Sequence, residues 1–108
     1  MTESEFNARV DDILSAIEEA IEESGAPVDY ETAGGILTLG FENGSKIIIN
    51  RQTPVRQVWV AAKSGGFHYD FDAEGEAWRQ SGSGEELFAA LSRLCSAQAG
   101  VSVVFPLR

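Results

Sequence analysis

The sequence predicts an α+β fold: a two-layer α-β sandwich whose antiparallel sheet of five or six strands carries an N-terminal and a C-terminal helix on one face. Apolar residues recur at helical spacing near each end of the chain, and short alternating segments separated by turn residues fill the middle. The turns are too short for parallel crossover connections, so the sheet should be antiparallel. Two amphipathic helices flanking such a meander can bury both apolar stripes only by packing side by side on one sheet face.

Length and charge narrow the class of protein. The 108 residues fit one domain, spanning 1–108, and the hydrophobic content of 44% is ordinary for a globular protein. A formal net charge of −9 argues against nucleic acid and anionic membranes as partners, because both would repel the chain. Met1 leads into a polar segment, and the single cysteine, Cys95, cannot form an internal disulfide, so we expect a cytoplasmic protein.

The first helix is predicted from the start of the chain to about Glu23. Thr2 and Glu5 have the spacing of a capping box, and Gly25 should end the helix. Acidic side chains occupy the arc opposite the apolar stripe, and this arc comprises Asp11, Asp12, Glu18, Glu19, Glu22 and Glu23.

The second helix is predicted to begin at a capping box formed by Ser83 and Glu86 and to end near Gly100. Cys95 lies on its apolar stripe and is expected to be a buried, inert thiol. The alternating tail that follows should fill the groove between the helices, and Pro106 should stop it from becoming a long strand. The tail residues concerned are Val101, Val103 and Phe105.

Between the helices, we expect strands at 28–31 and 36–42, a strand through Ile47-Ile48-Ile49 that ends before Pro54, and strands at 57–61, 67–71 and 77–80, joined by short turns. Gly34-Gly35 joins the first two strands, and Asn43-Gly44 predicts a type I′ hairpin between the second and third, because both residue types tolerate positive φ. Trp78 on the last strand is expected in the core.

Trp59 is expected on the sheet face away from the helices. It alternates with Val58 and Val60, so if the valines face the core, Trp59 points to the other side together with Gln57. Asn50 and Gln52 should lie there too, and His68 on the same face or its rim. An aromatic side chain in a polar surround is typical of an interface anchor, although a covering loop is the alternative.

The segment 47–71, IIINRQTPVRQVWVAAKSGGFHYDF, between an acidic first helix and a second helix that begins SGEELF, resembles the frataxins, in particular their bacterial members. The similarity extends over 4–100, and NRQTP-x-x-QVW is its specific part. The resemblance implies two helices over an antiparallel sheet and a role in iron-sulfur cluster assembly. It also implies weak, exchangeable binding of Fe²⁺ or Fe³⁺ and contacts with a cysteine desulfurase and an iron-sulfur scaffold protein. The net negative charge favours a monomer at low iron, with oligomerisation on binding iron as the alternative.

Carried over by position, the resemblance implies two sets of site residues. The metal-binding ridge would comprise Asp11, Glu18, Glu19, Glu22, Glu23, Asp29 and Glu31. The partner-binding residues on the sheet would be Asn50, Gln52, Gln57 and Trp59. The loop 24–27 is neutral where bacterial relatives often carry acidic residues, which implies a lower metal capacity.

The acidic helix face has a simpler alternative, a solvated surface without a ligand. However, Glu18 and Glu22 form a like-charge i,i+4 pair that costs roughly 0.2–0.5 kcal/mol, so cations should stabilise the helix. Carboxylate oxygens are hard ligands that suit iron and other divalent cations. His68 is either a plain surface residue or an auxiliary iron ligand.

We therefore expect an iron-binding regulator of cluster assembly rather than an enzyme. The alternatives are an iron donor or storage protein and a ferroxidase. The sequence lacks the Glu-x-x-His motif of di-iron carboxylate sites, which argues against the ferroxidase.

Overall fold

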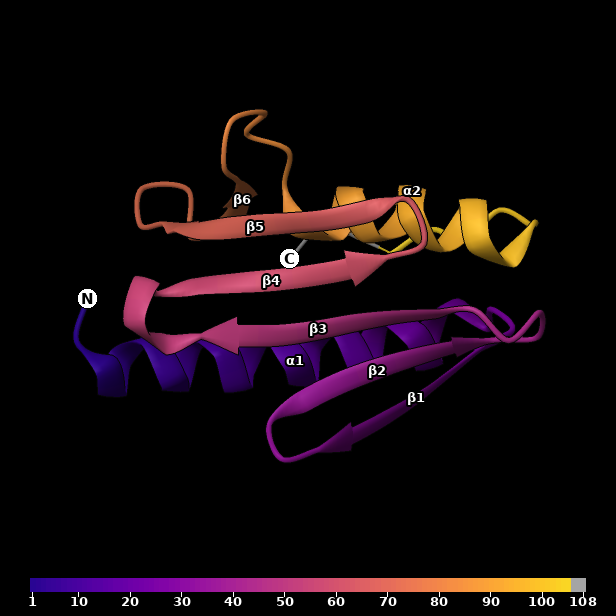
Figure 1. Cartoon of the computed structure of the whole chain (residues 1–108), viewed down its shortest axis with the longest axis horizontal. Helices are drawn as coiled ribbons and strands as arrows, with labels where there is room; N and C mark the ends of the chain where they lie inside the picture. The colour runs from indigo at the N-terminus through magenta and orange to yellow at the C-terminus, as the bar shows by residue number, and fades with distance from the viewer. Residues whose placement is uncertain (106–108) are drawn as a thin grey trace.

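The computed structural model describes residues 1–105 and, within them, two α-helices and one six-stranded sheet in which each strand pairs antiparallel with the next. The elements are α1 (Glu3–Ser24), β1 (Val28–Ala33), β2 (Ile36–Phe41), β3 (Lys46–Gln52), the 3₁₀ turn η1 (Thr53–Val55), β4 (Gln57–Ala62), β5 (Gly65–Asp72), β6 (Ala77–Gln80) and α2 (Leu87–Ala99). Both helices lie on the same side of the sheet (Figure 1). The predicted fold class is confirmed. Within residues 1–105, neither helix is long and apolar enough to cross a membrane.

Helix α1 has the predicted ends. The Thr2 hydroxyl accepts a hydrogen bond from the Glu5 N–H at 3.1 Å, and the Glu5 carboxylate accepts one from the Thr2 N–H at 3.4 Å. Together they satisfy two of the donors that a helix start leaves unpaired. Hydrogen bonding with the Thr2 side chain and with the Thr2 backbone N–H lowers the pKa of the Glu5 carboxyl. Gly25, with φ of 65°, ends the helix in the left-handed conformation that glycine adopts without strain.

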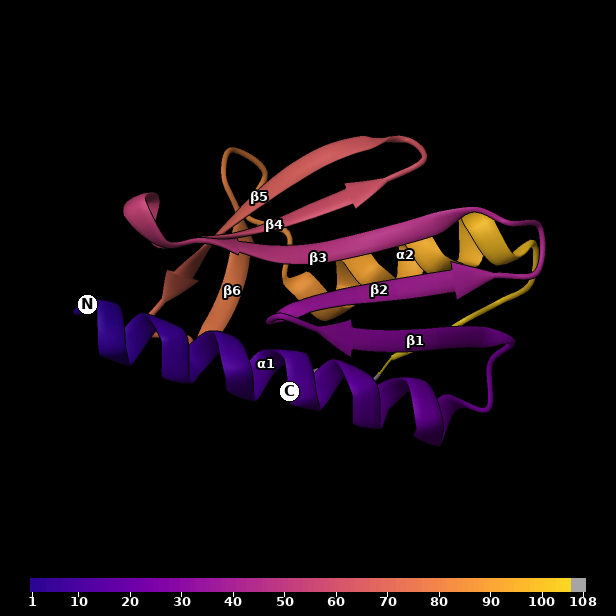
Figure 2. The same cartoon turned by 60° about the horizontal axis from the view of Figure 1, so that its bottom comes forward.

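The core lies between the sheet and the helices (Figure 2). Val58 and Val60 of β4 are buried, as the alternation predicts. Trp78 is only 3% exposed and packs edge-on between the rings of Phe6 and Phe71, which confirms it as a core residue. Cys95 is buried, and burial raises the pKa of its thiol to about 12, so the thiol stays protonated near neutral pH.

The predicted type I′ turn at Asn43-Gly44 is wrong. Gly44 has a φ of 84°, but Asn43 is not at positive φ, and a four-residue turn closes through the Gly44 N–H to the Phe41 carbonyl at 2.9 Å. The Asn43 side chain is engaged elsewhere, because its Nδ2 donates to the carbonyl of Gln98 at 2.8 Å. The two-residue turn with both φ values positive is instead Gly34-Gly35, at 60° and 77°.

The predicted start of α2 is also wrong. The N-cap is Glu86, whose carboxylate accepts from the Phe88 and Ala89 N–H groups, so the helix begins three residues later than a Ser83 cap would allow. The reason is a contact with the preceding strand: the Gln80 N–H donates to the Glu85 carbonyl at 2.9 Å, and Glu86 forms a β-bridge with Arg79 of β6. Gly100 ends the helix, as predicted.

The C-terminal tail packs as expected for Val103 and Phe105, which are buried, whereas Val101 is exposed. Two serines of α2 hold the tail: Ser96 Oγ accepts from the Val103 N–H, and Ser92 Oγ accepts from the Phe105 N–H, both at 2.9 Å. The expectation for Pro106 falls outside the described residues.

Candidate functional site

The first candidate surface is the acidic flank, which we define as Glu18, Glu19, Glu22 and Glu23 of α1 with the adjoining strand β1. Helix α1 runs alongside β1 (Figure 2). The Thr32 hydroxyl donates to the Glu18 carboxylate, and the Tyr30 hydroxyl donates to that of Glu22. Acceptance by Glu22 raises the pKa of Tyr30. These hydroxyls orient two of the four carboxylates, a feature that the sequence analysis missed.

The other two predicted metal ligands of this region, Asp29 and Glu31, lie on the opposite face of β1. Because strand side chains alternate, Tyr30 and Thr32 point toward α1, whereas Asp29 and Glu31 point to the face away from the helices. Both carboxylate residues are exposed. The structure therefore places acidic groups on both sides of an edge strand rather than in one row.

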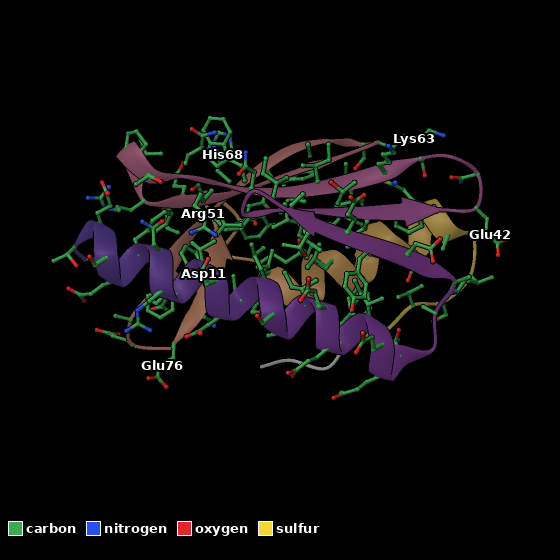
Figure 3. All side chains as sticks on the ribbon, turned by 90° about the horizontal axis from the view of Figure 1, so that it is seen from below. Asp11, Glu42, Arg51, Lys63, His68 and Glu76 are labelled. Atoms are coloured by element: carbon green, nitrogen blue, oxygen red, sulfur yellow. The ribbon has the colours of Figure 1, made fainter. Side chains whose placement is uncertain are left out.

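Asp11 is separated from the acidic flank. It lies two helical turns before Glu18, a distance of about 10 Å along the helix axis. Its carboxylate forms a 2.7 Å ion pair with Arg51 of β3, which also donates to Asn7 at 3.0 Å (Figure 3). Asp11 thus ties the helix to the sheet, and nothing in the sequence near Asp11 indicates this partner.

Carboxylate oxygens suit iron in chemical type. Within residues 1–105, however, no three side chains of Asp, Glu, His or Cys converge in a way that could hold a metal ion. The carboxylates are thus suitable iron ligands by chemical type, but residues 1–105 do not form a preorganised coordination site.

The second candidate surface is the open face, which we define as the outward side of β3, β4 and β5. Directly paired residues share a face, so Trp59 lies beside Asn50 on one neighbouring strand and His68 on the other. Gln52 and Gln57 form the next pair on this same face. The four predicted partner-binding residues are therefore together, on the side of the sheet opposite the helices.

The Trp59 ring is held from two directions. It stacks on the His68 ring with centroids 4.3 Å apart and an interplanar angle of 8°. Its Nε1 donates to the Gln57 side chain at 3.0 Å, and Gln57 in turn donates to Asp70 at 3.2 Å. Such a stack and network pre-orient the indole without covering it, and Trp59 remains 37% exposed. No loop among residues 1–105 buries it.

A shallow hollow of about 220 Å³ lies next to Trp59 on the open face. Its lining is largely apolar because Ile48, which is 40% exposed, and Ala61 contribute to it. Sequence analysis did not single out Ile48, although its alternation with Ile47 and Ile49 could have placed it there. His68 lies on this face, away from α1 (Figure 3), and so is remote from the α1 carboxylates.

These features define the class of the protein: a small α+β sandwich with helices on one sheet face, an uncovered second face and an acidic edge. The family model described as "Frataxin-like domain" matches residues 1–101. The chain belongs to the frataxin family.

Individual relatives agree along nearly the whole chain. The protein named "Iron-sulfur cluster assembly protein CyaY" of Pseudomonas aeruginosa is 49% identical over 106 residues, which cover 98% of each chain. Its namesake in Photobacterium profundum is 50% identical over 103 residues, covering 95% of this chain and 96% of that one. The solved structure of frataxin from Psychromonas ingrahamii has 45% identity and a TM-score of 0.90, covering 99% of this chain and 100% of the other.

Proposed function

We propose that this protein is an iron-binding regulator of iron-sulfur cluster assembly in the cytoplasm. It acts by binding a cysteine desulfurase and its scaffold protein through the acidic flank and the open face. The proposal rests on one observation: the same small domain has both an acidic edge and a half-exposed tryptophan, Trp59, whose ring is held in place by its neighbours. Relatives about half identical to this chain are named iron-sulfur cluster assembly proteins, which supports the process.

The two surfaces would do different work. The acidic flank would attract a basic partner surface over a distance and speed association, because the chain carries a net charge of −9. The open face would supply the short-range contact, because Trp59 and the hollow beside it can receive an apolar side chain and exclude water around it.

Iron would act as an effector or cargo bound by the flank carboxylates. Glu18 and Glu22 lie one helical turn apart on the same side of α1, so a cation between them would relieve their mutual repulsion. Neutralising part of the flank would also weaken its attraction for a basic partner, which couples the iron level to docking.

The test is sulfide production by the desulfurase with its scaffold, with and without this protein and with and without Fe²⁺. We expect the protein to change the rate, the change to depend on iron, and Trp59→Ala to lose most of the effect. Oxygen consumption with Fe²⁺ is measured in parallel, because catalytic oxidation of Fe²⁺ would indicate a ferroxidase instead. Full activity of Trp59→Ala with an unaltered iron response would contradict the proposed use of the open face.

A further inference from the structure

Strand β1 is an edge strand with an accessible outer side. It pairs only with β2 among the described strands, and it is first in the sheet order. No residue from Asp29 to Ala33 is buried. An exposed edge of this kind presents main-chain donors and acceptors to which another strand can pair.

The register shows which main-chain groups point outward. The two-residue turn at Gly34-Gly35 makes Ala33↔Ile36 the closing hydrogen-bonded pair, and such pairs recur at every second residue of an antiparallel ladder. Glu31 and Asp29 therefore direct their backbone groups toward β2. Tyr30 and Thr32, which alternate with them, direct their N–H and C=O groups away from the sheet.

The two sides of this edge have distinct chemistry. On the open-face side, Asp29 and Glu31 border a hollow of about 220 Å³ that also involves Thr38 and Lys46. On the helix side, a hollow of about 460 Å³ is lined by Ile21, Glu22, Val28 and Tyr30 among others, and Asp29 borders it too. A strand added here would place every second side chain beside two carboxylates and the remaining ones over a partly apolar recess.

We propose that β1 binds an extended, basic segment of a partner protein as a seventh, antiparallel strand. The segment would alternate Lys or Arg, next to Asp29 and Glu31, with residues of moderate size facing Tyr30 and Thr32. This deepens the proposed function, because it rests on the acidic flank as a partner contact and states how the contact is made. Main-chain hydrogen bonds supply affinity in this mode, and the alternate side chains supply specificity.

The charges favour a basic segment over a second copy of this chain. Pairing β1 with the β1 of another copy would bring Asp29 and Glu31 against their own counterparts, and like charges placed opposite each other destabilise a strand pair. The acidic residues therefore act against self-association while they attract a basic strand. Self-association through β1 would contradict the proposal and is checked by sedimentation of the unliganded protein.

The first test uses a capped pentapeptide, Lys-Val-Lys-Val-Lys, titrated into the protein and followed by amide chemical shifts. In an antiparallel pair, the valines lie opposite Tyr30 and Thr32 and exchange hydrogen bonds with them, whereas the lysine N–H groups point to solvent. We expect N-methylation of both valines to weaken binding about tenfold, since two main-chain hydrogen bonds are lost. Backbone N-methylation of two of the lysines, which keeps the charge and the number of added methyl groups, should leave binding unchanged.

Hydrogen exchange gives a second readout on the same samples. Binding should slow exchange of the Tyr30 and Thr32 amides, whereas the Glu31 amide, directed toward β2, should change little. Equal binding of both N-methylated peptides, or no slowing at Tyr30 and Thr32, would overturn the proposed strand addition. That result would leave the desulfurase assay untouched, so failure of the strand addition is distinguishable from failure of the proposed function.

Variants of the protein complete the test. Thr32→Pro removes an outward N–H at an edge position where proline is tolerated, and Thr32→Val is its control, because it loses the hydroxyl contact to Glu18 but keeps the N–H. We expect only the proline variant to lose slowed exchange at Tyr30 and most of the peptide affinity.

Asp29→Asn/Glu31→Gln should weaken binding, whereas Glu74→Gln/Glu76→Gln, with the same charge change in the turn between β5 and β6, should bind normally. Equal loss in both charge variants would show that net charge alone drives binding and would contradict the proposal.

Discussion

The acidic flank and the open face are built on different physical bases. On the open face, neighbouring strands hold Trp59 by ring stacking and by a chain of amide and carboxylate hydrogen bonds. On the flank, exposed carboxylates repel one another, and two of them are oriented by hydroxyls of β1. The comparison teaches that the open face is organised by its own contacts, whereas the flank carries like charges whose repulsion a cation or a basic partner would offset.

The largest expected effect on stability distinguishes the core tryptophan, Trp78, from the surface tryptophan, Trp59. Trp78→Ala should lower the free energy of unfolding by about 3–5 kcal/mol, because it opens a cavity between Phe6 and Phe71. Urea denaturation measures this loss. A similar loss for Trp59→Ala would mean that the open face is part of the core and would remove the basis of the comparison.

Trp59→Ala should instead weaken partner binding by about 2 kcal/mol while leaving the fold nearly as stable. Calorimetric titration with the desulfurase-scaffold complex measures the affinity. His68→Ala sharpens the result, because it keeps the indole but removes the ring stacked on it, and should cost less affinity than Trp59→Ala. An unchanged affinity in Trp59→Ala would show that the pre-organised surface is not the anchor.

Substitution of Arg51 tests whether Asp11 is a metal ligand or a structural link between α1 and β3. Arg51→Met should lower stability by about 1 kcal/mol, a modest value because the Asp11 carboxylate is largely exposed to solvent. A double-mutant cycle with Asp11→Asn should give a coupling of roughly 0.5 kcal/mol. If the cycle shows no coupling and Asp11→Asn binds iron more weakly, then Asp11 is a metal ligand and not a structural link.

The smallest effect concerns repulsion on the flank. Glu18→Gln/Glu22→Gln should raise the stability of the metal-free protein by roughly 0.2–0.5 kcal/mol, because one like-charge pair is removed while the amide oxygens can still accept from Thr32 and Tyr30. The same variant should show a smaller rise in Tm on addition of divalent or ferric cations. Glu74→Gln/Glu76→Gln is the charge-matched control. Destabilisation of the double Gln variant without metal would contradict the repulsion argument.

Much of the site was predictable because strand alternation is a local property. Val58 and Val60 place Trp59 on the outward face, and the register then brings His68 beside it. The contacts of the α1 carboxylates were not predictable, because each joins two different elements. Glu22 and Glu18 accept from Tyr30 and Thr32 of β1, and Asp11 pairs with Arg51 of β3. The resemblance to the frataxins placed Asp29 and Glu31 in one ridge with the α1 carboxylates, whereas strand alternation turns their side chains to the other face of β1.

The sequence by itself determined the two amphipathic helices, the antiparallel meander and the faces of its strands, because helical and strand periodicity are set by backbone geometry. Only the tertiary structure decided where α2 begins, which turn takes the type I′ form and which carboxylates have partners. Those outcomes depend on contacts between elements: the Glu85 carbonyl accepts from Gln80 of β6, Asn43 donates to the end of α2, and α1 packs against β1. Such contacts cannot be predicted from a local sequence pattern, because each depends on two segments that meet only in the folded protein.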